Sequence, residues 1–255
     1  MNILAIGDIV GNSGVEYTAA KIKEIVSRHN VDFVIANGEN AAVGNGITND
    51  AAQRLFSCGI DVITLGNHTF SKKDVVNLLL NKSVIRPINY PEHTVGEGCI
   101  VKEKNGKKIA VINAMGRLNL MNIDCPFKAC MRKIKKIKDE CDIIVVDFHS
   151  EATSEKGALA NYLDTFATVV YGTHTHVQTA DERILPGGTA FITDIGMTGV
   201  EDSILGVKKD IIIRRFMTQM PERFSLAEGK CRLCGAVFKI DDKTNKCTEI
   251  VRIRE

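Results

Sequence analysis

Short apolar runs alternate with helix-like amphipathic segments along the first part of the chain. The run at residues 2–6 precedes a segment whose apolar residues recur every three or four positions, as on the buried face of a helix: Val15, Ala19, Ile22, Ile25 and Val26. The unit recurs with a strand at 31–36 and a helix from Thr48 or Asn49 to Cys58. It recurs again with a strand at 60–65 and a helix whose Ser71 and Asp74 resemble a capping box. This alternation predicts an α/β protein with a mainly parallel, doubly wound sheet and helices on both faces.

The pattern changes in the middle of the chain, where antiparallel strands are expected. Apolar runs at 99–101 and 109–112 flank Asn105-Gly106, a strong hairpin signal. Further strands are expected at 142–147 and 166–171, and the runs 234–240 and 247–253 predict a second hairpin. No repeat or flexible linker divides these segments. We therefore expect a single domain over residues 1–255.

Composition narrows the classes of partner. The 33 basic and 31 acidic residues give a formal net charge of +2, so the overall charge favours neither stable nucleic-acid binding nor a membrane surface. No apolar stretch approaches the ~20 residues that span a bilayer, and the first residues enter a strand directly. Eight irregularly spaced cysteines are typical of reduced thiols, and Cys231 and Cys234 form only a weak zinc signal. We expect a cytoplasmic protein.

Two amphipathic segments each allow more than one interpretation. Residues 127–140 carry six basic side chains around a sparse apolar stripe, which favours a solvated helix over a phosphate- or RNA-binding patch. Residues 203–218 are apolar enough for core packing, which we favour, or for a subunit interface in a homo-oligomer.

Oxygen and imidazole donors follow five of the strand-like runs. They are Asp8, Glu39, Asn40, Asn67, His149, His174 and His176, with His68 next to Asn67. In open α/β sheets, ligands bind at the carboxyl ends of strands, so these side chains are expected to meet. They are too many for one four-coordinate ion, and donors without thiolate suit iron, manganese or zinc. The sequence therefore predicts a site for two metal ions.

Each donor taken alone has an ordinary structural interpretation. Asp8 could cap the following helix, Asn67 could fix a turn, and His149 could be a satisfied buried histidine. Their shared position at one sheet edge favours the metal site. On extended backbone, His174 and His176 would project to the same side and could face that site together.

Several motifs carry a family resemblance. The order Gly7-Asp8, Gly38-Glu39-Asn40, Gly66-Asn67-His68, His149 and Gly172-Thr-His174-Thr-His176 resembles the calcineurin-like metallophosphoesterases. The longer strings 147–156 and 172–181 are similar to those of the YmdB-type bacterial phosphodiesterases. This resemblance implies a four-layered α/β/β/α sandwich with mixed sheets and a dinuclear site, most often iron. It also implies hydrolysis of 2′,3′-cyclic nucleotides such as 2′,3′-cyclic AMP.

The resemblance assigns roles to these positions. Asp8, Glu39, Asn40 and His176 would hold the first metal. Glu39 would bridge to a second metal held with Asn67, His149 and His174, and His68 would be the proton donor. The chain departs from the broader superfamily at two positions, because Val10 stands where a histidine ligand is usual and Glu39 replaces an aspartate. Asn40 would replace the lost imidazole.

Taken with the predicted metal site, the resemblance implies a dinuclear metal-dependent phosphodiesterase that acts on small-molecule 2′,3′-cyclic nucleotides or on another nucleotide phosphodiester. A metal-bridging hydroxide would attack phosphorus, and His68 would protonate the leaving alkoxide. The alternatives are a broad phosphomonoesterase and a regulatory or scaffold protein that retains the fold. The loops at 42–47 and 151–157 follow ligands directly and are expected to edge the pocket. They are either ordinary turns or contact substrate, and substrate contact would be tested at Thr153 and Lys156.

Overall fold

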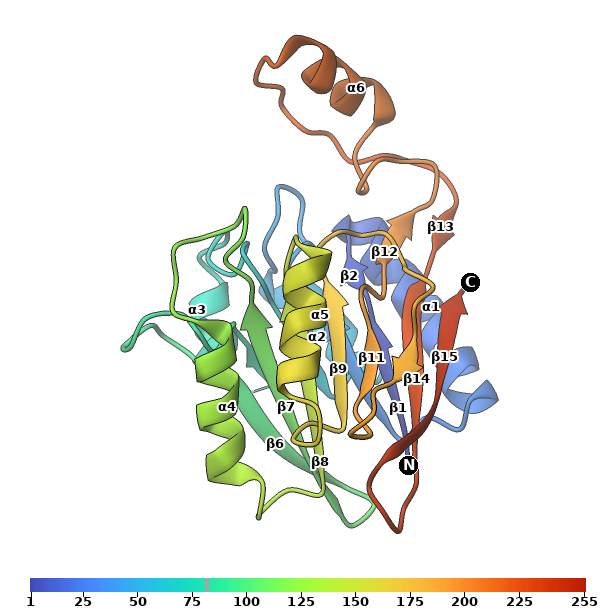
Figure 1. Cartoon of the computed structure of the whole chain (residues 1–255). Helices are drawn as coiled ribbons and strands as arrows, with labels where there is room; N and C mark the ends of the chain where they lie inside the picture. Colours follow the sequence, from blue (N-terminus) through green and yellow to red (C-terminus); the bar gives the residue numbers. More distant parts are fainter. Residues whose placement is uncertain (81–82) are drawn as a thin grey trace.

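Two six-stranded mixed sheets pack face to face between outer helices, as the computed structural model of residues 1–80 and 83–255 shows (Figure 1). The first sheet has the order β15-β14-β1-β3-β4-β5, with bounds Cys247–Arg254, Cys234–Ile240, Asn2–Ile6, Phe33–Asn37, Val62–Thr64 and Val84–Ile85. The second has the order β10-β11-β9-β8-β7-β6, with bounds Arg183–Ile184, Ala190–Ile192, Val169–Thr173, Ile143–His149, Lys107–Met115 and Cys99–Lys104. A small third sheet joins β13 (Cys231–Arg232), β12 (Met197–Val200) and β2 (Asp8–Ile9).

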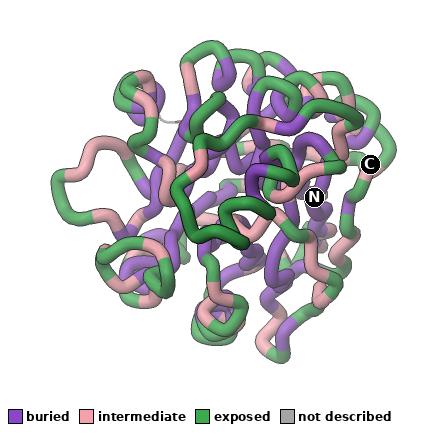
Figure 2. Tube along the Cα trace, turned by 90° about the horizontal axis from the view of Figure 1, so that it is seen from above, coloured by how far each residue is buried: buried purple, intermediate pink, exposed green. Residues whose placement is uncertain are grey.

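Helices cover the outer face of each large sheet. The first is covered by α1 (Gly11–Arg28), α2 (Asn49–Ser57) and α3 (Val75–Leu80), and the second by α4 (Pro126–Ile137) and α5 (Thr153–Tyr162). The resulting order of layers is α/β/β/α, so the four-layered fold that the family resemblance implies is confirmed. Viewed from above, buried strands occupy the centre and exposed turns the rim (Figure 2).

The single doubly wound sheet predicted from the alternation is wrong. The inner faces of the two sheets pack on each other through a continuous apolar cluster that includes Phe33, Val145, Tyr171 and Phe238. In the first sheet β1 pairs with β3 in parallel but with β14 antiparallel. A buried strand has two apolar faces whether a helix or a second sheet covers them, so hydrophobic periodicity could not distinguish these arrangements.

Most predicted elements form close to their expected bounds. Strands β6 and β7 pair antiparallel around Asn105 and Gly106, whose φ values of 51° and 74° suit a tight hairpin turn. Thr48 caps α2 by accepting a hydrogen bond from the Ala51 backbone N–H at 3.3 Å. The predicted capping box before α3 is wrong. This helix starts at Val75, and the Asp74 carboxylate accepts from the backbone N–H of Asn49.

Residues 201–230, here called the arm, extend away from the two sheets (Figure 1). The arm carries α6 (Lys209–Thr218), which buries only Ile211 and Ile212 against Val207 and Ile204. Phe216 and Met217 are 74% and 80% exposed. The preferred interpretation of 203–218 as core is therefore wrong for most of α6, because this helix is too far from the sheets to bury a full face.

The structure also bears on the expectations about the cysteines, the basic segment and membrane-spanning helices. All eight cysteines are free thiols, five of them buried. The basic segment forms α4, whose buried residues include Met131, Ile134 and Ile137, the predicted stripe. Within the described residues, no helix combines the length and apolar character needed to cross a membrane.

Candidate metal centre

The seven predicted metal-binding side chains lie at one edge of the sandwich. Asp8 begins β2, directly after β1, while Glu39 and Asn40 follow β3 and Asn67 follows β4. From the second sheet, His149 ends β8, and His174 and His176 follow β9. Because β1, β3 and β4 run parallel to one another, as do β8 and β9, their carboxyl ends bring these residues together.

Three of these side chains converge on Nε2 of a fourth, His149. This atom lies 3.1 Å from Glu39 Oε1, 2.9 Å from Asn67 Oδ1 and 3.0 Å from His174 Nδ1. Glu39, His149 and His174 each offer a donor atom within 4.8 Å of the others, an arrangement that could hold a metal ion. This group matches the predicted ligands of the second metal.

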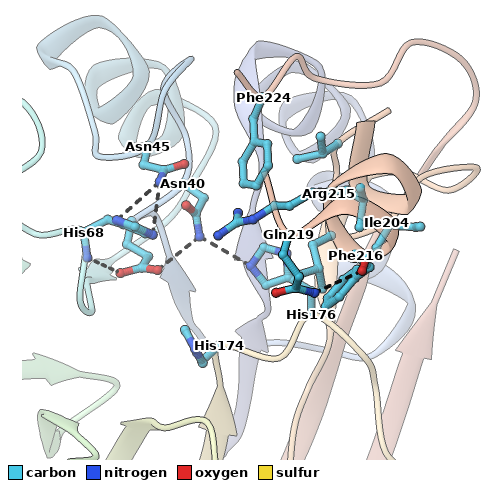
Figure 3. Close-up of a pocket in the computed structure, with 14 residues that line it drawn as sticks. Asn40, Asn45, His68, His174, His176, Ile204, Arg215, Phe216, Gln219 and Phe224 are labelled. Carbon is cyan, nitrogen blue, oxygen red and sulfur yellow. Dashed lines mark hydrogen bonds between the residues drawn. The ribbon is translucent and has the colours of Figure 1, made fainter. Parts of the chain in front are cut away.

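The other predicted group surrounds Asp8. His176 Nε2 lies 3.6 Å from Asp8 Oδ1. It also lies 3.4 Å from Asn40 Nδ2 (Figure 3). Asn40 Nδ2 also donates to Glu39 Oε1 at 3.1 Å, so Glu39 touches both groups. Metal binding by Asn40 would require its amide to turn so that Oδ1 faces the centre. Asn67 already presents its oxygen to His149.

The buried carboxylates and imidazoles of the two groups shift one another's pKa values. Burial opposes a charged His149 ring, but the carboxylates of Glu39, Asp8 and Asp147 outweigh it and raise the pKa of His149 to about 9. Burial and the neighbouring His149 lower the pKa of His174 to about 4. Burial would raise the pKa of Asp8, yet His176 and His149 hold that pKa far below its usual value.

One buried atom indicates that the centre suits a cation. Asp8 Oδ1 is fully buried without a hydrogen-bond partner among the described residues. His176 Nδ1 is likewise buried without a partner within this part of the structure. An unpaired buried carboxylate oxygen is costly, and coordination to a metal ion would satisfy it. The oxygen and imidazole donors present therefore fit a metal centre.

A hydrogen-bond chain behind His149 fixes its ring. The Thr173 hydroxyl donates to Asp147 Oδ1 at 2.8 Å and lies 2.9 Å from His149 Nδ1. Because its proton goes to Asp147, this hydroxyl accepts from Nδ1–H, which directs Nε2 toward the centre. Asp147 also accepts from Thr64, and burial raises the pKa of this carboxyl to about 6.

The loop carrying His174 and His176 differs from the prediction. Strand β9 ends at Thr173, and these two histidines adopt φ values of 99° and 63° rather than extended backbone. Both still reach the centre, but they serve different groups, His174 near Glu39 and His176 near Asp8. Left-handed backbone at non-glycine residues is uncommon and persists where surrounding structure holds it.

Asp194 fixes this loop through hydrogen bonds to Thr175. Its Oδ2 accepts from the Thr175 backbone N–H at 3.1 Å, from the Thr175 hydroxyl at 2.8 Å and from Lys156 Nζ at 2.6 Å. Lys156 and Asp194 are both buried. The alternative in which Lys156 contacts substrate is therefore wrong, because its ammonium is committed to a buried ion pair.

Sequence reasoning missed the two carboxylates behind the centre. Asp147 stands two residues before His149 on the same strand, so strand alternation alone would place both on one face. That signal was available. Asp194 follows the apolar strand β11, a position that resembles the other donors, but nothing in the sequence pairs it with Lys156.

His68 lies at the mouth of the centre. Its backbone N–H donates to Glu39 Oε2 at 2.9 Å, and its ring lies 3.1 Å from Asn45 Nδ2 (Figure 3). The imidazole is half-buried and lines the cavity, without sitting among the metal-binding side chains. This placement leaves it open to a substrate, as a proton donor requires.

Each of the two loops predicted to edge the pocket places one residue near the metal-binding side chains. Asn45, from the glycine-rich loop 42–47, lines the cavity beside His68. Glu151 follows β8 and places Oε2 3.1 Å from His174 Nε2. Thr153 begins α5, is exposed, and does not line the cavity.

The cavity above the centre has a volume of about 440 Å³. One wall consists of Glu39, Asn40, Asn45, His68, His174 and His176. The opposite wall comes from the arm and includes Arg215, Phe216 and Phe224 (Figure 3). The volume lies within the ~300–1,000 Å³ typical of small-molecule sites.

Comparison with known proteins places this centre in a family. The family of YmdB-like proteins matches residues 4–253. The chain belongs to the YmdB-like family. A curated relative, the 2′,3′-cyclic-nucleotide 2′-phosphodiesterase of Bacillus subtilis, is 47% identical over 99% of this chain and 96% of its own. The family resemblance inferred from the motifs is thereby confirmed. Because this relative is an enzyme, the comparison also supports the prediction that the present chain is an enzyme.

Solved structures share the YmdB-like fold closely. A phosphatase from Mycoplasma pneumoniae superimposes with a TM-score of 0.95 at 35% identity, covering 100% of this chain and 93% of its own. A hypothetical protein from Thermus thermophilus gives a TM-score of 0.94 at 38% identity, covering 100% and 99%. Both similarities extend across the whole chain, the arm included.

Proposed function

We propose that this protein is a metal-dependent phosphodiesterase that hydrolyses 2′,3′-cyclic nucleotides, with 2′,3′-cyclic AMP as a substrate. The observation that carries the proposal is the convergence of Glu39, Asn67 and His174 on His149, beside a buried Asp8 oxygen without a partner. The activity of the Bacillus subtilis relative supplies the substrate class.

The donor set fits two cations, of which iron is our first choice and manganese or zinc the others. Asp8, Asn40 and His176 would hold one, Asn67, His149 and His174 the other, and Glu39 would bridge them. When bound, such ions supply Lewis-acid activation of the phosphoryl group and of a water. His68 would donate a proton to the leaving alkoxide of the ribose.

The first test is hydrolysis of 2′,3′-cyclic AMP by the purified protein. Activity would be measured as purified, after chelation, and after adding back iron or manganese, with para-nitrophenyl phosphate in parallel. Metal-dependent cleavage that favours the diester is expected. Cleavage of the monoester alone would instead indicate a phosphomonoesterase, and a metal-loaded protein inert toward both would indicate a regulatory or scaffold role.

The bridging role of Glu39 has its own test. Glu39→Ala removes the carboxylate proposed to bridge the two groups, so both cations should be lost together with activity. Metal content would be measured by elemental analysis of the purified variant. Two metal ions per chain in Glu39→Ala would contradict the bridge. Glu249→Ala, which removes an exposed carboxylate on β15 that pairs with Lys239, is the control and should keep its metal.

A further inference from the structure

The arm places its two aromatic side chains on the wall of the cavity. Phe216 and Phe224 are the aromatic residues of 201–230, and both line the cavity opposite the metal-binding side chains (Figure 3). They are nevertheless 74% and 46% exposed. Exposed aromatic rings that border a polar centre form a surface suited to an apolar, planar ligand group.

The exposed aliphatic residues of α6 have a different placement. Met217 and Ile213 are 80% and 51% exposed and do not line the cavity. Aromatic character on the arm is thus concentrated on the side facing the centre. This distribution favours a ligand that reaches from the centre to the arm over a partner that covers α6 from outside.

A basic group lies against one of the two aromatic rings. The Arg215 guanidinium is 5.0 Å from the centre of the Phe224 ring and extends toward Asn40 (Figure 3). Among the described residues that line the cavity, Arg215 is the one arginine or lysine. A cation held against an aromatic face can stack on a base or pair with a phosphate.

We propose that Phe216 and Phe224, with Arg215 beside them, form a nucleobase-binding wall that determines substrate specificity. This inference rests on the proposed function. A nucleoside 2′,3′-cyclic phosphate carries its base on the same ribose as its reacting phosphate. With the phosphate at Glu39 and His68, the base occupies the remaining part of the cavity, against the arm. Stacking on an aromatic face suits every base, so this wall selects nucleosides over base-free diesters.

The test compares two cyclic diesters that share the reacting five-membered ring. One is 2′,3′-cyclic AMP, and the other is glycerol 1,2-cyclic phosphate, which has no base. In Phe216→Ala and Phe224→Ala, KM for cyclic AMP should rise by between about fivefold and 150-fold, the range expected for loss of one base–aromatic stack. The kcat should stay within about twofold, and glycerol cyclic phosphate should be hydrolysed as before.

Two further variants serve as controls. Phe216→Tyr keeps an aromatic face and should retain the KM of the unaltered protein. Met217→Ala removes an equally exposed neighbour that lies outside the cavity and should leave both substrates unaffected. An unchanged KM in both alanine variants, or an equal loss on both diesters, would overturn the nucleobase wall. A change of oligomeric state without a change of KM, seen by light scattering, would also overturn it.

Equilibrium dialysis with adenosine 2′-monophosphate separates this inference from the proposed function. The unaltered protein should bind this nucleotide, and Phe216→Ala should bind it at least about fivefold more weakly. Failure to hydrolyse either diester would reject the phosphodiesterase, while the dialysis would still decide on the nucleobase wall. Hydrolysis of both diesters without nucleotide binding would reject the wall alone.

Discussion

Single atoms behind and beside His149 determine how this residue can act. Thr173 and Asp147 fix Nδ1 from behind, so Nε2 faces Glu39, Asn67 and His174. Gly66 provides the space in front. A Cβ added at Gly66 would overlap the His149 ring and the Glu39 carboxylate. The identity of the residue beside Asn67 is therefore set by steric contact with the centre.

Gly66→Ala is expected to abolish metal binding. The added methyl group must displace His149 or Glu39, and ligand atoms tolerate only small displacements. Metal content after reconstitution, measured by elemental analysis, should fall from that of the unaltered protein to near zero. Gly157→Ala, whose added Cβ meets no neighbouring atom, is the control and should keep its metal. Full metal content in Gly66→Ala would contradict the proposed ligand geometry.

His68 should affect turnover without affecting metal content. Its ring borders the cavity but lies outside the cluster of donors, so His68→Asn should lower kcat by ~10²–10⁴-fold, the usual contribution of general acid catalysis. Steady-state kinetics with 2′,3′-cyclic AMP and elemental analysis of the same sample provide the measurement. The exposed His93 offers the control His93→Asn. Undiminished turnover in His68→Asn would remove this residue from the mechanism.

Elements of secondary structure deliver the donors, but a loop places the last two. The segment after β9 holds His174 and His176 with left-handed backbone, fastened to Asp194 through Thr175. The Lys156–Asp194 pair ties α5 to this loop. Helix α5 therefore stabilises the loop that carries His174 and His176 without contributing a metal-binding residue itself.

Lys156→Met is expected to destabilise the protein and disturb the loop. It leaves the buried Asp194 carboxylate without its cation, a change that typically lowers the free energy of unfolding by ~3–5 kcal/mol. Urea denaturation would measure the loss. Lys209→Met breaks the exposed pair with Asp202 and should leave stability nearly unchanged. Equal stability of both variants would show that the buried pair contributes little.

The sequence best predicted the fold and the site where an apolar strand is followed directly by a residue that can bind a metal ion. Apolar runs followed by Asp8, Glu39, Asn67 and His149 predicted both the strands and their common edge. The backbone of His174, with its φ of 99°, could not be predicted in this way, because its contacts are with distant segments. Its N–H donates to Asp8, 166 residues earlier, and the N–H of the next residue, Thr175, donates to Asp194. Pairing between distant segments leaves no periodic signal.

At the scale of the whole molecule, the protein brings two carboxylates and three imidazoles into a small buried volume. In the absence of metal, its carboxylates raise the pKa of His149 to about 9, so the ring carries a proton at neutral pH. A metal ion that binds Nε2 must displace that proton. Proton and metal therefore compete for one atom.

Metal affinity should accordingly rise with pH up to about 9 and level off above it. Below that pH, each binding event at His149 should release about one proton. Titration calorimetry with manganese in two buffers of different ionisation enthalpy would measure the release. Burial is outweighed by Asp8, which raises the pKa of His176 as well, so His149→Asn should reduce the buffer dependence without abolishing it. A heat independent of buffer in the unaltered protein would contradict the raised pKa of His149.

The order of strands also constrains how the whole molecule can be assembled during synthesis. Strand β1 lies between β3 and β14, and β14 starts 228 residues after Ile6, at Cys234. Every proposed metal-binding residue has been translated by His176, yet one edge of β1 still lacks its neighbour. An unpaired strand edge readily associates with other chains. The nascent chain therefore carries a complete set of donors on an unfinished sheet until β14 leaves the ribosome.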